Sequence, residues 1–336
     1  MMSTTQQVVA LAAAALTLAA CERPPVETSQ TGFRGTAMVD VSNPRLPEAE
    51  SSYPASLPAA PAAGPKAGDV YQNVEVLGDL SVGQFTRLMT SITQWVSPEE
   101  GCNYCHYPDN LADDGKYTKV VSRRMIQMTQ HVNQSWSDHV GKNGVNCYTC
   151  HRGNNVPEYI WFSEASSSFG NAYFAGWRNG QNMPNEGVGF TSLPSDSYTT
   201  FLMKPEGGQS IRLASADAFA TPELGLSIKD AEYTYGLMMN WSQALGVNCT
   251  YCHNTRAFQN WEQSTPQRIT AHHGLNMVRN LNAEYLVPLG PVYPDNRLGP
   301  HDGDAPKAYC ATCHQGVNKP LGGADAVSAY PALGGR

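Results

Sequence analysis

The stretch that decides the fold is GVNCYTCHRG, residues 144–153. Within it, two cysteines stand two residues apart and a histidine follows the second. The same spacing recurs at 102–106, 249–253 and 310–314, and the four copies use eight of the nine cysteines. Cys-x-x-Cys-His is the attachment signature of c-type haem, in which two thiols bind one porphyrin and the histidine ligates its iron. The sequence therefore predicts four covalently bound haem c groups.

Each motif assigns three residues to one haem. The predicted attachment cysteines are Cys102, Cys105, Cys147, Cys150, Cys249, Cys252, Cys310 and Cys313, and the predicted proximal ligands are His106, His151, His253 and His314. A disulfide framework is the alternative for eight cysteines in an exported protein, but disulfide chemistry has no use for the histidines. Zinc sites would not need a histidine in the same place after every pair.

The motifs alternate in type. The first and third share Tyr-Cys-His, whereas the second and fourth share Cys-His-x-Gly. Apolar residues recur at helical spacing in segments 80–96, 118–136, 228–245 and 266–286. We therefore expect a mainly α fold with extensive irregular coil. In this multihaem cytochrome c, four helix–turn–CxxCH units would form two halves related by a pseudo-two-fold.

The composition and net charge of the chain indicate the class of partner. The chain has 336 residues, 30 glycines and 23 prolines, and a net charge of −7. This acidity argues against a nucleic-acid partner and fits a basic protein.

We predict a signal and lipobox segment at 1–21, an extended tether at 22–75, haem pair one and two at 76–153, a connector at 154–222, haem pair three and four at 223–318, and a tail at 319–336.

The N-terminus resembles an export signal. The apolar run from Val8 to Ala20 is too short to cross a bilayer comfortably. It ends Leu18-Ala19-Ala20-Cys21, which looks like a bacterial lipobox and makes Cys21 the predicted lipid anchor. Residues 1–7 carry no Lys or Arg, although such a region is normally positive. An ordinary signal peptide and an uncleaved anchor therefore stay open.

The second axial ligand of each iron separates electron transfer from catalysis, because catalysis needs an open face. Met89 precedes Cys102 by 13 residues and Met238 precedes Cys249 by 11, and each follows a leucine. Spacing does not decide which residue is the second ligand at the other two sites. Site two has Met125 or Met128, and site four has Met277 or a histidine from elsewhere.

From Leu80 to Gly316 the chain resembles the tetrahaem cytochrome subunit on the periplasmic face of purple-bacterial-type photosynthetic reaction centres. The resemblance is strongest in the sequences VSRRM (121–125), GVNCYTCHRG (144–153) and STPQR (264–268). It implies Met89, Met125 and Met238 as distal ligands of haems one to three. For haem four it implies His139, from the segment before the second attachment site.

The resemblance also implies a function. The chain would be an electron-transfer subunit and not an enzyme, re-reducing the photo-oxidised bacteriochlorophyll pair. Its partners would be the reaction centre L and M subunits and a soluble donor, either cytochrome c2 or a high-potential iron–sulfur protein. It would sit on the periplasmic face of the inner membrane, anchored at Cys21. A multihaem reductase and a free periplasmic electron carrier are the alternatives.

The remaining histidines and methionines, Arg268 and five acids receive structural or docking roles. We expect His131 to lie at the surface or pack at a haem edge, His272 and His273 to pack against a haem, and His301 to be solvated. Met128, Met239 and Met277 are expected in the core. Arg268 is expected either beside haem three, raising its potential, or at the surface. Five acids around the first motif could steer a basic donor: Glu99, Glu100, Asp109, Asp113 and Asp114.

Overall fold

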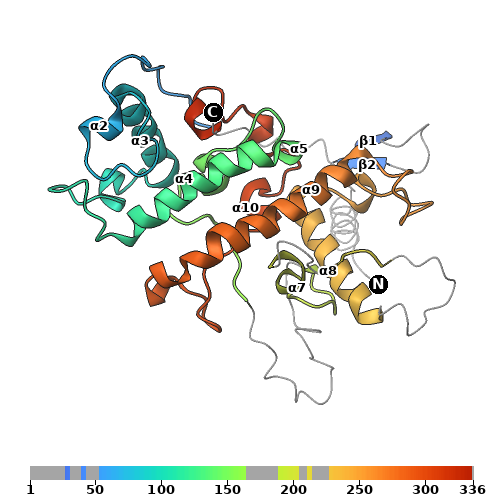
Figure 1. Cartoon of the computed structure of the whole chain (residues 1–336). Coiled ribbons are helices and arrows are strands. Elements are labelled where there is room, and N and C mark those ends of the chain that lie inside the picture. Colours follow the sequence, from blue (N-terminus) through green and yellow to red (C-terminus); the bar gives the residue numbers. More distant parts are fainter. Residues whose placement is uncertain are drawn as a thin grey trace, which may run out of the picture.

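The computed structural model describes residues 27–30, 39–42, 53–163, 188–203, 210–213 and 227–334. In these ranges the protein is mainly helical with extensive coil (Figure 1). The first part contains α2 (Ala67–Val70), α3 (Val82–Val96), the 3₁₀ turn η2 (Gly101–Tyr104), α4 (Tyr117–Ser135), α5 (Ser137–Val140) and α6 (Cys147–His151).

The second part repeats the alternation of long and short helices. It contains α7 (Tyr198–Leu202), α8 (Ile228–Leu245), η6 (Cys249–Tyr251), α9 (Pro266–Leu281), the π-helical η7 (Asn282–Leu286), η8 (Val287–Val292), η9 (Asp295–Arg297), α10 (Cys310–His314), η10 (Pro320–Gly323) and η11 (Pro331–Gly334). The four long helices expected from the sequence are α3, α4, α8 and α9.

Local signals explain where the long helices begin. Ser81 caps α3 in a reciprocal box, since its hydroxyl accepts from Gln84 N at 3.2 Å and the Gln84 side chain accepts from Ser81 N at 3.3 Å. Asp230 likewise accepts from Ser227 N at 2.7 Å at the start of α8. Proline 266 occupies the first turn of α9, where its missing N–H costs nothing.

A two-stranded antiparallel sheet lies in the segment expected to be an extended tether. Strand β1 (Glu27–Gln30) pairs with β2 (Val39–Ser42), with Glu27 opposite Ser42. This strand pair was not expected from the sequence. The rest of 22–52 lies outside the described residues, and the proposed domain boundaries stay predictions.

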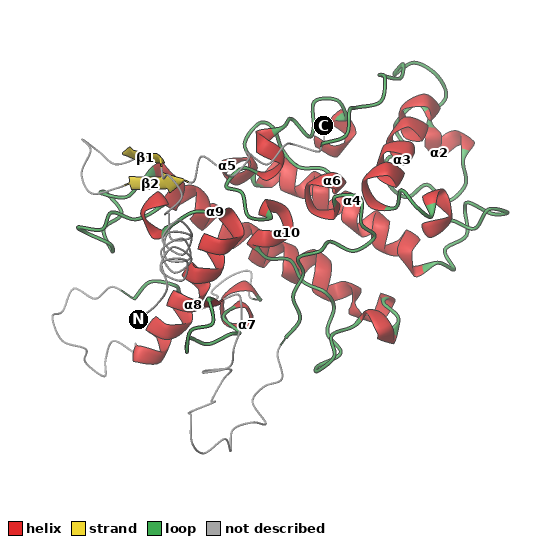
Figure 2. Ribbon diagram, turned by 180° about the vertical axis from the view of Figure 1, so that it is seen from behind, coloured by secondary structure: helices red, strands yellow, loops and turns green. Residues whose placement is uncertain are grey.

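The long helices set the arrangement of the other elements (Figures 1 and 2). Helices α4 and α9 lie side by side, with α2 and α3 toward one end of the molecule, α7 and α8 toward the other, and α10 between them. His131 Nε2 on α4 is 2.9 Å from Asn280 Oδ1 on α9, and Arg124 on α4 donates to the carbonyl of Glu284. No helix in the described ranges is both long and apolar enough to span a membrane.

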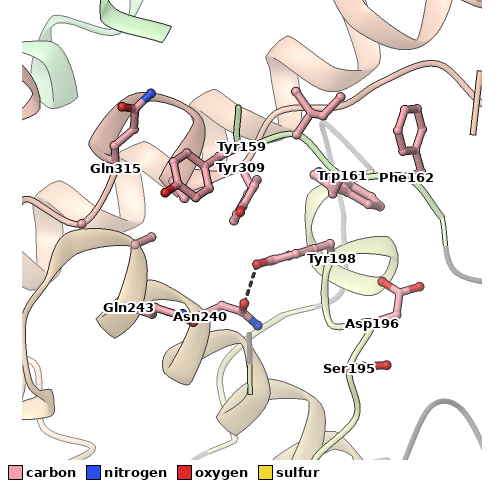
Figure 3. Close-up of a pocket in the computed structure, with 14 residues that line it drawn as sticks. Tyr159, Trp161, Phe162, Ser195, Asp196, Tyr198, Asn240, Gln243, Tyr309 and Gln315 are labelled. Atoms are coloured by element: carbon pink, nitrogen blue, oxygen red, sulfur yellow. Dashed lines mark hydrogen bonds between the residues drawn. The ribbon is translucent and has the colours of Figure 1, made fainter. Parts of the chain in front are cut away.

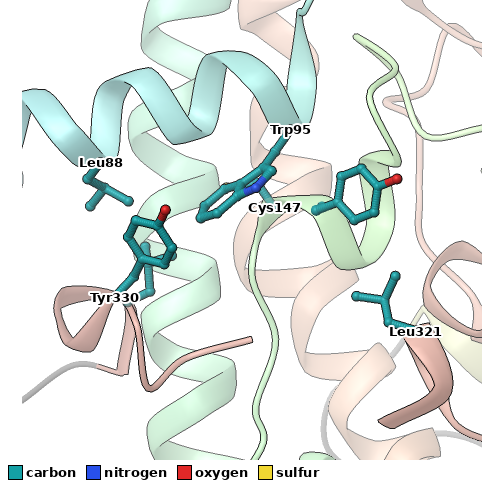
Figure 4. Packing of buried hydrophobic residues seen from close by; sticks show 7 residues of the cluster. Leu88, Trp95, Cys147, Leu321 and Tyr330 are labelled. Carbon is teal, nitrogen blue, oxygen red and sulfur yellow. The ribbon is translucent and has the colours of Figure 1, made fainter. Parts of the chain in front are cut away.

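One hydrophobic cluster joins the first motif pair to the end of the chain (Figure 4). Leu88 and Trp95 of α3 pack with Cys147 and Tyr148 of α6, and with Leu321, Tyr330 and Leu333 from the last part of the chain. The rings of Trp95 and Tyr330 meet edge to face at 4.9 Å. Residues 319–334, which belong to the predicted tail 319–336, therefore contribute to this core.

A second cluster joins α4, α7 and α9. Its buried residues are Val132, Trp161, Leu202, Leu275, Met277, Val278 and Leu281. Residues 159–163 of the connector take part, because Trp161 exchanges both backbone hydrogen bonds with Lys307 at 3.0 Å. Two described parts of the predicted connector, at Trp161 and at Leu202 of α7, thus pack in one cluster with α4 and α9.

Tyr330 fastens the N-terminal strap, residues 53–62, to α3. Its hydroxyl accepts from Leu57 N at 3.1 Å and lies 2.7 Å from Ser91 Oγ. Ser91 Oγ itself donates to Arg87 O at 3.0 Å, so the Tyr330 hydroxyl is the donor to Ser91. Arg87 lies over the Tyr330 ring at 4.0 Å.

We predict that Tyr330→Phe lowers the free energy of unfolding by about 1–3 kcal/mol, because Leu57 N loses its acceptor and Ser91 Oγ loses the hydroxyl that donates to it. Denaturant unfolding of the haem-loaded protein measures the change. Tyr71→Phe is the matched control, since Tyr71 is 42 % exposed. Equal stabilities of the two variants would contradict the prediction.

Gly246, at the end of α8, permits close approach to the loop after α10. Its φ is +65°, and a Cβ there would collide with the carbonyl oxygen of Gly316. We predict that Gly246→Ala destabilises the protein by about 1–3 kcal/mol through backbone strain and this collision. Gly290→Ala is the control, because a Cβ at 290 meets nothing within 4 Å. Thermal unfolding that leaves both variants unchanged would refute the prediction.

Candidate functional site

Each Cys-x-x-Cys-His motif begins on a short helix, η2, α6, η6 or α10. One helical turn places the two cysteines three residues apart on one face, with the histidine next to them. Asn146 starts α6 because its side chain accepts from Thr149 N at 3.3 Å while its own N–H donates to Thr149 Oγ1 at 3.1 Å. Tyr309 N donates to Thr312 Oγ1 at 3.0 Å at the start of α10. All eight motif cysteines are free of disulfide bonds.

The second and fourth motifs end in the same backbone turn. Arg152 and Gln315, which follow the histidines, adopt left-handed conformations with φ of 52° and 49°. The next residues are glycines, and each donates its N–H to a long helix that precedes it in the chain, α3 or α8. Gly153 N donates to Trp95 O at 2.9 Å, and Gly316 N donates to Ala244 O at 2.8 Å. The shared Cys-His-x-Gly sequence thus corresponds to a shared turn.

The first and third motifs share a different contact. Thr118, in the first turn of α4, donates its hydroxyl to Tyr104 O at 2.6 Å. Thr265, at the start of α9, donates to Tyr251 O at the same distance. Each hydroxyl therefore ties the start of the following long helix to the second residue between the paired cysteines.

All four motif histidines make the same kind of hydrogen bond. His106 Nδ1 lies 2.8 Å from Leu111 O and His253 Nδ1 lies 2.9 Å from Phe258 O, each five residues further on. His151 and His314 use carbonyls three residues further on: the bonds to Asn154 O and Val317 O measure 2.9 and 3.0 Å. A carbonyl oxygen only accepts, so Nδ1 carries the proton in each ring. Nε2 is left with the lone pair that binds a metal.

His139 on α5 is a fifth histidine of this type. Its Nδ1 lies 2.9 Å from Thr270 O on α9, and its ring centroid is 6.0 Å from that of His314. A histidine–metal bond is about 2 Å long, so two such bonds plus the radii of two imidazoles add to about this spacing. The structure therefore brings together two of the predicted ligands of haem four.

Burial disfavours the charged form of four of these imidazoles, those of His139, His151, His253 and His314. Burial, followed by the neighbouring His139, lowers the pKa of His314 to about 4. Burial also lowers the pKa of His139, His151 and His253 below the ordinary histidine value. Neutral imidazole is the form that ligates iron, so the residues present fit an axially ligated haem.

The second and fourth motifs touch each other. Cys150 Sγ lies 2.7 Å from Cys313 Sγ. Arg152 Nη2 donates to Cys313 O at 3.3 Å, and Gln315 Nε2 donates to Cys150 O at 3.4 Å. The residue after each histidine therefore reaches the second cysteine of the other motif.

The predicted methionine ligands lie half-buried on three of the long helices. Met89 is on α3, Met125 on α4 and Met238 on α8. The carbonyls of Met89 and Met125 each accept a threonine hydroxyl at 2.9 Å, from Thr93 and Thr129. Met277, the alternative for site four, is 7 % exposed within the second cluster, and Met128 packs against the same cluster.

Of the remaining histidines, His131 is half-buried and His272 is exposed, and the expected packing of His272 and His273 against a haem stays a prediction. His131 Nε2 faces Asn280, and its ring lies 5.5 Å from that of Tyr285. His272 meets Trp261 edge to face at 6.0 Å. His301 is exposed.

Two cations reach carbonyls that accept from motif histidines. Arg268 Nη1 lies 3.4 Å from Phe258 O, the acceptor of His253. Buried Lys119 donates to Leu111 O, the acceptor of His106, at 2.9 Å. The sequence indicated a role for Arg268 but none for Lys119. The acceptor of Lys119, the carbonyl oxygen of Leu111, is a main-chain atom, which no residue type in the sequence reveals.

The five acids near the first motif differ in their freedom to meet a partner. Asp114 pairs with Arg123 at 2.9 Å and with Lys119 at 3.0 Å, and Arg123 is the main reason that the pKa of Asp114 is lowered. Glu100 accepts from Ser97 and Asn155, and Asp113 from Gly115 N. Glu99 and Asp109 are exposed.

An aromatic pocket of about 480 Å³ lies beside site four (Figure 3). Tyr198 donates to Asn240 Oδ1 at 2.5 Å across it. Ala311 of α10 and Gln315, which directly follows α10, line it, but the three predicted haem-binding residues Cys310, Cys313 and His314 do not. The predicted lipid anchor Cys21 lies outside the described residues.

Known proteins resemble this chain over nearly its whole length. The family profile of the photosynthetic reaction centre cytochrome C subunit matches residues 22–334. Three relatives are each named photosynthetic reaction center cytochrome c subunit. The protein of Rubrivivax gelatinosus is 52 % identical, covering 97 % of this chain and 88 % of its own. That of Thermochromatium tepidum is 49 % identical, with coverages of 95 % and 78 %. That of Roseobacter denitrificans is 44 % identical, with coverages of 92 % and 86 %. The chain belongs to the photosynthetic reaction centre cytochrome c subunit family, and its function is electron transfer in the reaction centre.

Proposed function

We propose that this chain accepts electrons from a soluble periplasmic carrier and passes them to the photo-oxidised bacteriochlorophyll pair through four covalently bound haem c groups. The observation that carries the proposal is the shared histidine geometry. All four motif histidines use Nδ1 on a main-chain carbonyl and keep Nε2 for iron. When bound, each haem supplies a one-electron couple, and the protein contributes ligation, spacing and docking.

The proposed haem sets follow the motifs. Each haem is attached through the two cysteines of its motif and ligated by the following histidine, and the distal ligands are Met89, Met125, Met238 and His139 for haems one to four. Two strong axial ligands hold the iron with little rearrangement on changing charge and leave no face for a substrate. The chain then acts as an electron carrier and not as an enzyme.

We further propose that the two motif pairs form halves related by a pseudo-two-fold. Three sets of matched contacts support this symmetry: the threonine hydroxyls of Thr118 and Thr265, the glycine turns after α6 and α10, and the reciprocal bonds of Arg152 and Gln315. Haems two and four would then lie at the centre, because their attachment helices are in contact.

The proposed location is the periplasmic face of the photosynthetic inner membrane. The chain would rest on the L and M subunits and be anchored through a lipid on Cys21. Its donor would be cytochrome c2 or a high-potential iron–sulfur protein. Near haem one, the exposed acids Glu99 and Asp109 stand close in sequence to exposed Tyr107 and Leu111. Acid and apolar surface together suit a transient electron-transfer partner.

Flash excitation of the native membrane complex tests the proposal. We expect haem absorbance to bleach in step with re-reduction of the bacteriochlorophyll pair, and the purified chain to carry the mass of four porphyrins. A mass increment of fewer than four haems, or a reaction centre that recovers without haem oxidation, would refute it.

We predict that His139→Met raises the midpoint potential of haem four, because Met/His ligation favours the ferrous state over bis-histidine ligation. The rise should be a sizeable part of the range of about 0.8 V that axial ligands cover. Spectroelectrochemical titration measures it. Met277→Leu is the control for the alternative ligand and should leave all four potentials in place. A potential that moves in M277L and not in H139M would reverse the assignment.

We predict that the pair Glu99→Gln and Asp109→Asn slows reduction by a basic donor about tenfold at low salt, because electrostatic steering is lost. The difference should vanish at high ionic strength, where the charges are screened. Stopped-flow reduction measures the rate. Asp302→Asn, an equally exposed acid outside this patch, should reduce at the wild-type rate. Salt-independent rates in all variants would exclude docking at these acids.

A further inference from the structure

The middle of α9 carries a glycine that its own backbone does not require. Gly274 is the single glycine of α9, nine residues into a sixteen-residue helix, and it is not among the glycines with positive φ. Glycine inside a helix costs about 1 kcal/mol relative to alanine. A local conformational need does not explain Gly274, which leaves the space beside its Cα as the reason for a glycine.

That space is filled by the ring of His139. A Cβ at 274 would lie 2.5 Å from Cε1, 2.8 Å from Nδ1 and 3.1 Å from Nε2 of His139. The first two distances are shorter than real Cβ atoms show, and all three atoms belong to one rigid ring. The ring therefore cannot yield by bending one flexible end, and alanine at 274 would displace the whole imidazole.

The same stretch of α9 also fixes the rotation of this ring. His139 Nδ1 donates to Thr270 O at 2.9 Å, one helical turn before Gly274. The carrier helix α5 spans only Ser137–Val140, so it provides little orientation of its own. Contact with the α9 backbone and the bond to Thr270 together hold the His139 ring beside the ring of His314. Because Nδ1 donates to Thr270 O, Nε2 is the ring nitrogen that stays available for iron.

The geometry points to Gly274 as a positioning residue for the distal ligand of haem four, acting together with the Thr270 carbonyl as a seat for the His139 ring. This inference rests on the proposed ligation of haem four by His139. A side chain at 274 would push the ring off α9, break its bond to Thr270 and weaken the distal bond to iron. Helix propensity acts in the opposite direction, because alanine would otherwise stabilise α9.

The test uses Gly274→Ala, His139→Met and the double variant in the full haem-loaded chain. We expect G274A to shift the midpoint potential of haem four, to reduce its bis-histidine low-spin signal and to let carbon monoxide bind one reduced haem. In the H139M background the ring is absent, so adding G274A should change neither the potential nor carbon monoxide binding. Such non-additivity is the signature of a direct contact.

Gly83→Ala is the matched control, because it also adds a methyl group inside a helix, where the Cβ meets Ala60 at an ordinary 3.6 Å. It should leave haem four unchanged. If G274A yields no folded protein while the double variant folds, the ring–methyl conflict is confirmed; if both fail, the inference is wrong. It is also wrong if H139M changes haem four and G274A does not. A haem four unaffected by H139M would instead overturn the proposed ligation.

Discussion

The hydrogen bond from each motif histidine to a main-chain carbonyl is the constraint on which the rest of this structure depends. It fixes the tautomer, so the nitrogen facing the cofactor always has its lone pair available. It also fixes the plane of the imidazole ring, because the accepting carbonyl lies only three or five residues further along the chain. At the second and fourth motifs, glycine N–H groups of the turns after the histidines donate to carbonyls of α3 and α8, and at the first and third motifs a threonine at the start of α4 or α9 donates to the motif backbone. The orientation of the histidine ligands therefore depends on the packing of the long helices.

The sequence predicts well whatever is local. The attachment motifs are contiguous, and the four long helices follow from apolar periodicity and caps such as Ser81–Gln84. Interactions between distant segments left no such signal. Residues 319–334 resemble a tail by composition, yet Leu321, Tyr330 and Leu333 lie in the core, because the surface that buries them comes from α3 and α6. The β1–β2 pair was missed because its strands are short and embedded in a polar segment.

The site shows the same division. Cysteines and proximal histidines are readable from spacing, whereas the choice between Met277 and a distant histidine at site four is not. The structure places Met277 in a hydrophobic cluster and the His139 ring near that of His314. Carbonyl partners such as Leu111 and Phe258 could not be found from residue type, because every residue has a carbonyl. The same holds for Gly274, whose significance appears only when the neighbouring helix is in view.

The contacts of Tyr330 have a consequence for biogenesis. Its hydroxyl bridges partners 273 and 239 residues away, Leu57 and Ser91. Contacts of such high sequence separation form late, since a long loop must close first. A chain emerging from its N-terminus thus exposes both leading haem-attachment motifs well before residue 330 can seal the core behind them. Of their cysteines, Cys147 lies in this core, so the side of its thiol that faces the last segment stays uncovered until that segment has been made.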